Sequence, residues 1–247
     1  MNSDTRFFQV IKEHVVFGNH AVVKSIKEDV SLDEPVYAIN WFNTRSRWVY
    51  DLYNILAARS VYKIGGKVFF KGTVAKTLQG TNENSREVLL IVNYPSGVRF
   101  LDLMKDWGFI AVSVLRELAV KQFSFGFTQR LDRNAALQNG KVAFDRSKSF
   151  AIHHFKTDKP VPAFIPMIQT AAESKGIEVY YAGQTSSLLY AQNKEGKDTQ
   201  IPCLLDGLLM FEGDTDSELE IFLSSDEYQK NIAQFDSSYM ALLNRVM

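Results

Sequence analysis

Two adjacent histidines, His153 and His154, are the residues of this chain best suited to acid–base chemistry. They lie in the run over residues 150–155, which predicts a β-strand. Adjacent residues of a strand point to opposite faces of the sheet, so one imidazole must face its inner side. Because an imidazole titrates near neutral pH, we predict a catalytic role for the pair. The alternative is structural, with one histidine exposed at the end of the sheet and the other hydrogen-bonded in the core.

A second group of candidate residues lies on strands predicted elsewhere in the chain. Tyr180 is a candidate catalytic acid toward an aromatic or enolic ligand, and Gln184 is expected on the same face of its strand. The equivalent strand of the first half places Phe69 and Lys71 on one face, and Arg130 ends a later strand. We predict that these residues bind the ligand. The alternatives are again structural, because strand tyrosines often pack with the hydroxyl at the rim and strand-end arginines often face solvent.

Other chemistries have little support among the remaining residues. The four histidines and the single Cys203 lack the spacing of a zinc site, so we predict no metal. We also predict no cofactor, although His153 or His154 could ligate a haem. The sequence contains neither a nucleotide-binding glycine motif nor the Gly-x-Ser-x-Gly elbow of serine hydrolases. Cys203 lies in an apolar run and is expected to be a buried thiol.

Composition indicates a folded protein without a strong attraction to charged polymers. The chain has 247 residues, 46% of them hydrophobic, and its 28 basic residues balance 28 acidic ones. This balance argues against nucleic acid as a partner, and no apolar run reaches the ~20 residues that a membrane span needs. The single cysteine excludes an intramolecular disulfide, and no signal-peptide core follows Met1. We therefore expect a cytoplasmic protein.

The elements that must position the candidate residues occur twice in the chain. Residues 36–44 match residues 149–157, with Ala, Ile, Phe and Thr at the same steps. Residues 67–72 match residues 178–183 at nearly the same separation. In this alignment Asn40 and Trp41 occupy the steps of the histidine pair, so we add both to the candidate ligand-binding residues. The spacing predicts an internal duplication of one small domain.

Both halves are predicted to follow a β-α-β-β-α-β order. In the first half we expect strands over residues 36–42, 68–78, 88–92 and 123–128, and helices over residues 47–58 and 98–121. In the second half we expect strands over residues 150–155, 179–190, 203–211 and 240–243, and helices over residues 162–174 and 217–235. The predicted boundaries are an extension over residues 1–34, a first unit over 35–131 and a second unit over 141–247.

A unit of this order is ferredoxin-like, with two helices on one face of a four-stranded antiparallel sheet. Its other face is apolar, and an exposed apolar sheet invites aggregation. The sheet of the second unit is the simplest cover for that face. We therefore predict an α+β fold in which two tandem ferredoxin-like units close one barrel within the chain, either as a monomer or as a homodimer of such barrels.

The region that ends the third predicted strand resembles a known signature. Residues 88–96 run into Tyr94-Pro95-Ser96 and are followed by Phe100-Leu101, a pattern similar to the DUF1330-like family. The second half keeps the helical part in Phe222-Leu223 but has Gly213-Asp214 in place of Pro-Ser. This family belongs to the dimeric α/β-barrel superfamily. The resemblance implies a barrel of paired ferredoxin-like units, and members of the superfamily include cofactor-independent monooxygenases, isomerases, polyketide cyclases, haem-dependent enzymes and ligand-sensing modules.

These observations lead to two functional hypotheses. The first is a cofactor-independent enzyme of the monooxygenase, isomerase or cyclase type that acts on an apolar or aromatic compound inside the barrel. The second is a non-catalytic ligand-binding or protein-interaction module, which the lack of a convergent acid, base and nucleophile favours. Because one fold can carry many activities, the fold alone does not choose between them.

Overall fold

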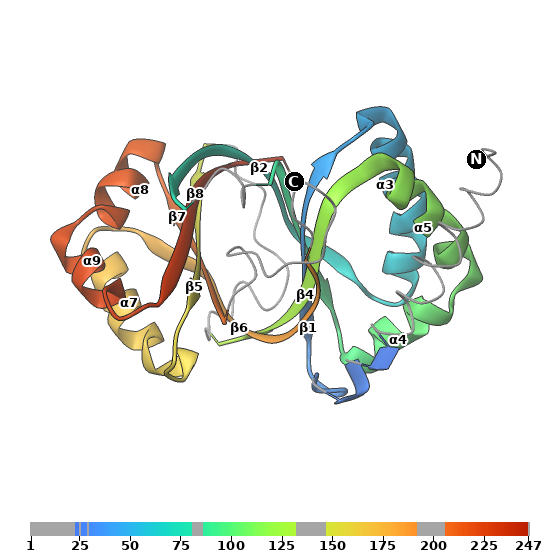
Figure 1. The fold of residues 1–247 in the computed structure, drawn as a ribbon, viewed down its shortest axis with the longest axis horizontal. Coiled ribbons are helices and arrows are strands. Elements are labelled where there is room, and N and C mark those ends of the chain that lie inside the picture. Colours follow the sequence, from blue (N-terminus) through green and yellow to red (C-terminus); the bar gives the residue numbers. More distant parts are fainter. Residues whose placement is uncertain are drawn as a thin grey trace.

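Eight antiparallel strands close into one barrel in the computed structural model of the chain, and helices cover it on two opposite sides (Figure 1). The structure describes residues 23–24, 26–28, 30–80, 86–131, 147–191 and 206–246, with the backbone alone for residues 187–191. Most of the predicted extension over residues 1–34 and the predicted buried thiol Cys203 lie outside the described residues.

Each half of the chain forms one ferredoxin-like unit. The first unit consists of β1 (Val36–Thr44), α3 (Arg47–Lys63), β2 (Lys67–Gln79), β3 (Val88–Tyr94), α4 (Gly97–Lys105), α5 (Trp107–Ala119) and β4 (Val120–Arg130). The second consists of β5 (Ser149–Lys156), the 3-10 helix η2 (Val161–Ala163), α7 (Ile165–Glu173), β6 (Glu178–Ala191), β7 (Gly207–Gly213), α8 (Asp216–Leu223), α9 (Asp226–Ile232) and β8 (Ser237–Arg245). The predicted α+β barrel of two such units is confirmed.

The strands follow each other around the barrel in the order β1-β3-β2-β8-β5-β7-β6-β4. Two seams join the units. β2 pairs with β8 from Gly72 opposite Arg245 onward, and β4 pairs with β6 up to Arg130 opposite Gly183. Because both seams are hydrogen-bonded, the barrel leaves no open sheet edge among the described strands.

The alternation of side chains along each strand divides the core into layers. In β1, Tyr37, Ile39 and Trp41 belong to a cluster inside the barrel, whereas Val36 and Ala38 pack beneath the helices of the first unit. The second unit has the same arrangement, with Phe150 and Ile152 inside. Both faces of these strands are apolar because both faces are covered.

Bulges interrupt this alternation at equivalent places in the two units. The register of β2 against β3 shifts between Val68 and Phe70, and that of β6 against β7 shifts between Val179 and Tyr181. Strict alternation would turn Phe70 and Tyr181 away from Phe69 and Tyr180, but the structure departs from it here. A bulge adds one residue to its strand, so both neighbouring rings turn into the barrel in each unit.

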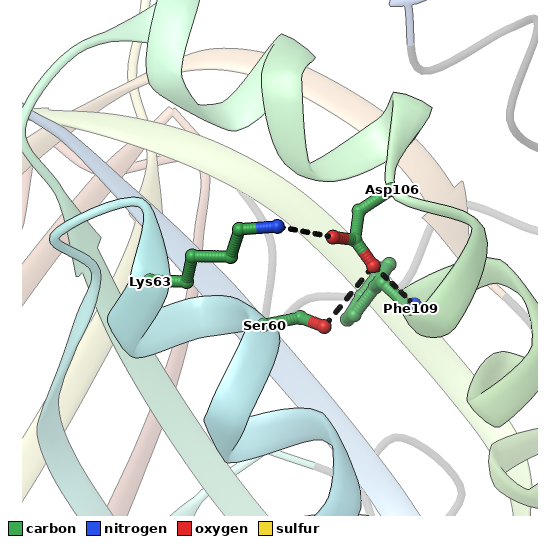
Figure 2. A network of polar contacts seen from close by, with 4 residues as sticks. All are labelled: Ser60, Lys63, Asp106 and Phe109. Carbon is green, nitrogen blue, oxygen red and sulfur yellow. Dashed lines mark hydrogen bonds and ion pairs between the residues drawn. The ribbon is translucent and has the colours of Figure 1, made fainter.

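The long helix predicted over residues 98–121 is divided into α4 and α5 at Asp106, which ends one helix and caps the next. Figure 2 shows the contacts of its carboxylate, which accepts from the Phe109 backbone N–H at 2.8 Å, from Ser60 Oγ at 3.2 Å and from Lys63 Nζ at 3.5 Å. These hydrogen bonds, above all that from Phe109, hold the pKa of Asp106 below its usual value. They also tie α3 to the start of α5.

The helices of the second unit are divided as well. The helix predicted over residues 217–235 is two helices, α8 and α9, and Ser225 caps the second by accepting from the Tyr228 backbone N–H. The helix predicted over residues 162–174 begins as the short η2 before α7. Within the part of the chain that the structure describes, no helix has the length and apolar composition of a membrane span.

Candidate functional site

His154 points into the barrel, where it meets its counterpart from the first unit. Its Nε2 accepts a hydrogen bond of 3.0 Å from Trp41 Nε1, and the two residues are 113 positions apart, the separation that aligns the repeats. Tyr239 packs edge-on against the same indole, with ring centres 6.1 Å apart. Because Nε2 is the acceptor, the proton of a neutral His154 ring lies on Nδ1.

His153 points the opposite way, between the sheet and α9. Its Nδ1 lies 2.7 Å from the Tyr228 hydroxyl and its Nε2 lies 3.0 Å from the Ser238 hydroxyl. The ring is fully buried and also packs against Phe155 and Phe235. Both nitrogens are thus engaged in contacts that join β5 to α9 and β8, which is a structural role.

Burial strongly changes the acidity of both imidazoles. It lowers the pKa of His153 to about 3, and that of His154 to about 3 with a smaller contribution from the neighbouring His153. Both rings are therefore neutral at physiological pH, and a ring of such low basicity is a weak general base. The catalytic role predicted for the pair stays a prediction, and the geometry does not favour it.

A different cluster forms at the end of the barrel where β4 and β8 finish and β1 and β5 begin. We call it the arginine end, because a guanidinium group from each unit lies over aromatic rings there. The Arg130 guanidinium lies 5.6 Å from the ring centres of Phe69 and Tyr181. The Arg245 guanidinium lies 5.6, 5.2 and 5.5 Å from those of Phe70, Phe150 and Tyr180.

The arginine end follows the pseudo-twofold symmetry of the two units. The first and second units contribute equivalent residues to it: Tyr37, Phe69, Phe70 and Arg130 from the first, and Phe150, Tyr180, Tyr181 and Arg245 from the second. Ring centres 5.1 to 5.3 Å apart join Tyr37 to Tyr181 and Phe69, and Phe150 to Tyr180 and Phe70. Each arginine contacts a ring of its own unit and a ring of the other unit.

Two glycines make room for these rings. Gly183 lies opposite Arg130 and Gly72 lies opposite Arg245 in the strand register. A Cβ at Gly183 would lie 2.6 Å from Cε1 of Tyr181, and a Cβ at Gly72 would lie 2.8 Å from Cε1 of Phe70. In each unit, the missing side chain lets the ring two residues earlier lie over the strand beside the guanidinium.

Two hydroxyl groups supply polar contacts at this end. The Tyr181 hydroxyl lies 2.6 Å from Thr128 Oγ1. Burial raises the pKa of Tyr180, although the charges of Arg245 and Arg130 and a hydrogen bond from Arg245 oppose this effect, and Glu212 adds to it. Tyr180 is therefore protonated at neutral pH and can donate a hydrogen bond.

The structure does not bring the predicted catalytic residues together. Phe150, which contacts Tyr180, and His154 lie four residues apart on β5, or about 13 Å at the rise of a strand. His153 lies outside the barrel wall altogether. Tyr180 and the two histidines therefore cannot act on one reacting atom in this arrangement.

Three of the predicted ligand-binding residues also lie away from the interior. The Asn40 amide donates to the Leu90 carbonyl at 3.1 Å, and Lys71 Nζ lies 4.9 Å from the ring centre of Tyr50 on α3. The prediction that Gln184 shares a face with Tyr180 is wrong, because the bulge in β6 turns Gln184 outward to solvent. Phe69, Trp41 and Arg130 do contact the interior cluster or lie within it.

Arg245 was not among the residues predicted from the sequence, and Tyr37 and Phe150 had no predicted role. The signal for Arg245 was present, since the strand that it ends is the counterpart of the strand that Arg130 ends. Extending the repeat alignment to the last strand of each unit would have paired the two arginines.

Metal and haem binding have little structural basis in the described residues. Among them, no group of three His, Cys, Asp or Glu side chains gathers as metal ligands would. His153 has both nitrogens engaged, and His154 would have to give up its bond from Trp41 to bind iron through Nε2. Neither histidine therefore fits the axial ligand of a haem.

Comparisons with solved structures find the same fold in other proteins. An anthrone oxidase-like protein is 12% identical with a TM-score of 0.54, and the alignment covers 87% of this chain and 92% of that one. A provisionally assigned monooxygenase from Fusobacterium nucleatum is 10% identical with a TM-score of 0.51, over 87% of this chain and 93% of that one.

A smaller protein of unknown function from Rhodopseudomonas palustris is 19% identical with a TM-score of 0.41, over 44% of this chain and 91% of that one. Neither family models nor curated protein sequences give a match, so the DUF1330-like assignment remains a resemblance. The anthrone oxidase-like protein and the Fusobacterium nucleatum protein therefore share the fold of this chain, in which two ferredoxin-like units close one barrel.

Proposed function

We propose that this barrel binds an apolar or aromatic small molecule at its arginine end. The observation that carries the proposal is the placement of two guanidinium groups, one from each unit, over five aromatic rings drawn from both units. Flat rings favour a flat apolar ligand through stacked or edge-on contacts. A few polar groups beside such rings are what orients a ligand in an otherwise apolar site.

The polar groups of this end suit a ligand that bears an enol, phenol or carbonyl oxygen. Tyr180 is protonated and can donate to that oxygen, while the positive charges of Arg245 and Arg130 favour its anionic form. This combination supports cofactor-independent chemistry of the monooxygenase, isomerase or cyclase type, in which an enolate-like state forms. Proteins of the same fold include ones named as a monooxygenase and as anthrone oxidase-like, which is in keeping with such chemistry.

The second candidate function is ligand binding without catalysis. The state of the two histidines favours it, because both are buried, neutral and held in hydrogen bonds. Enolate formation needs a base as well as a stabilised oxyanion, and neither imidazole is placed to serve near Tyr180. In this case the arginine end would hold a ligand and leave it unchanged.

Native mass spectrometry of the protein purified from its own host tests the proposal. We expect a bound small molecule in the native protein and in the Gln184→Ala control, whose substituted side chain faces solvent. The bound species should be lost or much reduced in Arg245→Ala. A protein that carries no ligand and also fails to bind anthrone or naphthols in titrations would refute the proposal.

The Tyr180→Phe variant separates the two functions, because it removes one hydroxyl and keeps the ring. For an enzyme, we expect this variant to retain the ligand and lose turnover of it. For a binding module, neither the native protein nor the variant should convert the bound compound. Retention of full activity in Tyr180→Phe would remove this residue from the chemistry.

A further inference from the structure

The helix α3 carries an apolar surface on the side that faces away from the barrel. Trp48, Leu52, Ile55 and Tyr62 are 73%, 40%, 72% and 56% exposed, and they recur every three to seven residues along the helix. We call these four residues the α3 stripe. The opposite side of the same helix is buried through Tyr50 and Ala57. A helix that is apolar on its solvent side as well as on its core side is typical of a protein interface.

The stripe is a property of the first unit and is not required by the fold. In α7, the equivalent helix of the second unit, Met167 is the one large apolar residue exposed within the described region, at 38%. Trp107 at the start of α5 is 82% exposed. It follows Asp106, whose carboxylate contacts Ser60 and Lys63 of α3, so Trp107 is next in the chain to the residue that joins α5 to the last turns of α3.

We propose that the α3 stripe is the contact surface of a homodimer, in which two copies of α3 pack antiparallel about a twofold axis at Ile55. In that arrangement, residues at equal distances before and after Ile55 meet across the interface. Trp48 of each copy then lies at the level of Tyr62 of the other. Exposed Asp51 of each copy lies at the level of exposed Arg59 of the other, so this pair of charges beside the stripe is complementary.

The exposed area also suits this partner. From the exposed fractions and the usual size of aromatic side chains, the stripe and Trp107 offer roughly 600 Å² per copy, near the ~800 Å² that each partner buries in a standard interface. Two indoles and a tyrosine ring are also the side-chain types that dominate the binding energy of interfaces. An isologous pair is the commonest way for a soluble chain to cover such a surface.

Sedimentation velocity of the full-length protein over a wide concentration range tests this proposal. We expect a dimer that Ile55→Glu weakens by roughly a hundredfold in dissociation constant, because it places two carboxylates together at the axis. Met167→Glu on α7 is the matched control and should leave the dimer intact. A single-chain mass at all concentrations, or a dimer that Ile55→Glu does not weaken, would overturn the proposal.

A charge exchange tests the antiparallel register itself. Asp51→Arg and Arg59→Asp should each weaken the dimer, since each places like charges at the same level of the two helices. The double variant Asp51→Arg/Arg59→Asp should restore the association, because the exchanged pair is complementary again. Failure of the double variant to recover would overturn the antiparallel register at Ile55.

Discussion

The two adjacent histidines show how one residue type can serve two environments. His154 joins the units by accepting from Trp41 inside the barrel, and His153 joins β5 to α9 and β8 outside it. Neither ring faces solvent, and their hydrogen-bond partners Trp41, Tyr228 and Ser238 carry no charge. Both rings are buried in the neutral form, so the free energy of unfolding depends on pH wherever the unfolded chain protonates them.

This burial predicts a loss of stability in mild acid. The unfolded chain protonates each imidazole near its ordinary pKa of 6.5, whereas the folded chain does so only at about 3. Between these values the unfolded state binds more protons, so the free energy of unfolding falls as the pH falls. The expected slope is about 1.4 kcal/mol per pH unit for each histidine.

The variant His154→Gln isolates the contribution of one ring. Glutamine can still accept from Trp41 but does not titrate, so this variant should lose about half of the histidine-dependent slope between about pH 4 and about pH 6. Urea unfolding at a series of pH values measures it, and Gln184→Ala should keep the native slope. An unchanged slope in His154→Gln would mean that the folded protein already protonates this ring.

At the scale of the elements, the bulges in β2 and β6 decide which aromatic rings enter the barrel. Each bulge adds a second ring to the interior, Phe70 beside Phe69 and Tyr181 beside Tyr180. Without the bulges, the strands would alternate and each unit would place one ring of the pair under its helices. The arginine end therefore depends on the irregular part of the strands.

The glycine after each bulge is a second requirement, and Gly183→Ala tests it. The added Cβ would force the Tyr181 ring away from Arg130 and from Thr128, so we expect a cost of about 1–3 kcal/mol in the free energy of unfolding. In a Tyr181→Ala background the same substitution should cost much less. Chemical denaturation of the four proteins forms a double-mutant cycle. Additive costs would show that the backbone, and not the ring, resists the methyl group.

The strands and helices also show which features of this fold can be predicted from the sequence and which cannot. The matches between residues 36–44 and 149–157 predicted the ferredoxin-like units and aligned Trp41 with His154, the pair that meets in the barrel. The face predicted for Gln184 was wrong because a strict period of two along a strand cannot reveal an inserted residue. The single helix predicted over residues 98–121 was wrong because the apolar pattern continues across Asp106, while the break depends on hydrogen bonds that its carboxylate accepts from Ser60 and Phe109. Arg245 was within reach of the alignment, but its position over Phe70 of β2 required the closed barrel.

At the scale of the molecule, the two seams make each unit the cover of the other. The seam strands β2 and β4 of the first unit bond to β8 and β6 of the second, and the interior cluster takes residues from both sheets. A unit alone would expose two strand edges and one apolar sheet face. Closure of the barrel therefore contributes stability that neither half has by itself.

The contacts across the barrel further predict that the halves recognise each other. A pair of first halves would bring two Trp41 indoles together, each with an N–H and no acceptor, whereas the native pairing sets one indole against the Nε2 of His154. We expect separately produced polypeptides of residues 35–131 and 141–247 to be aggregated or self-associated when alone, and to form a one-to-one complex with a higher melting temperature when refolded together.

Mass measurement during size-exclusion chromatography distinguishes these species, and a Trp41→Phe first half should lose part of its preference for the second. A half that is monomeric and unfolds cooperatively alone would contradict the prediction, because such a half would not need its partner sheet to cover its own apolar face.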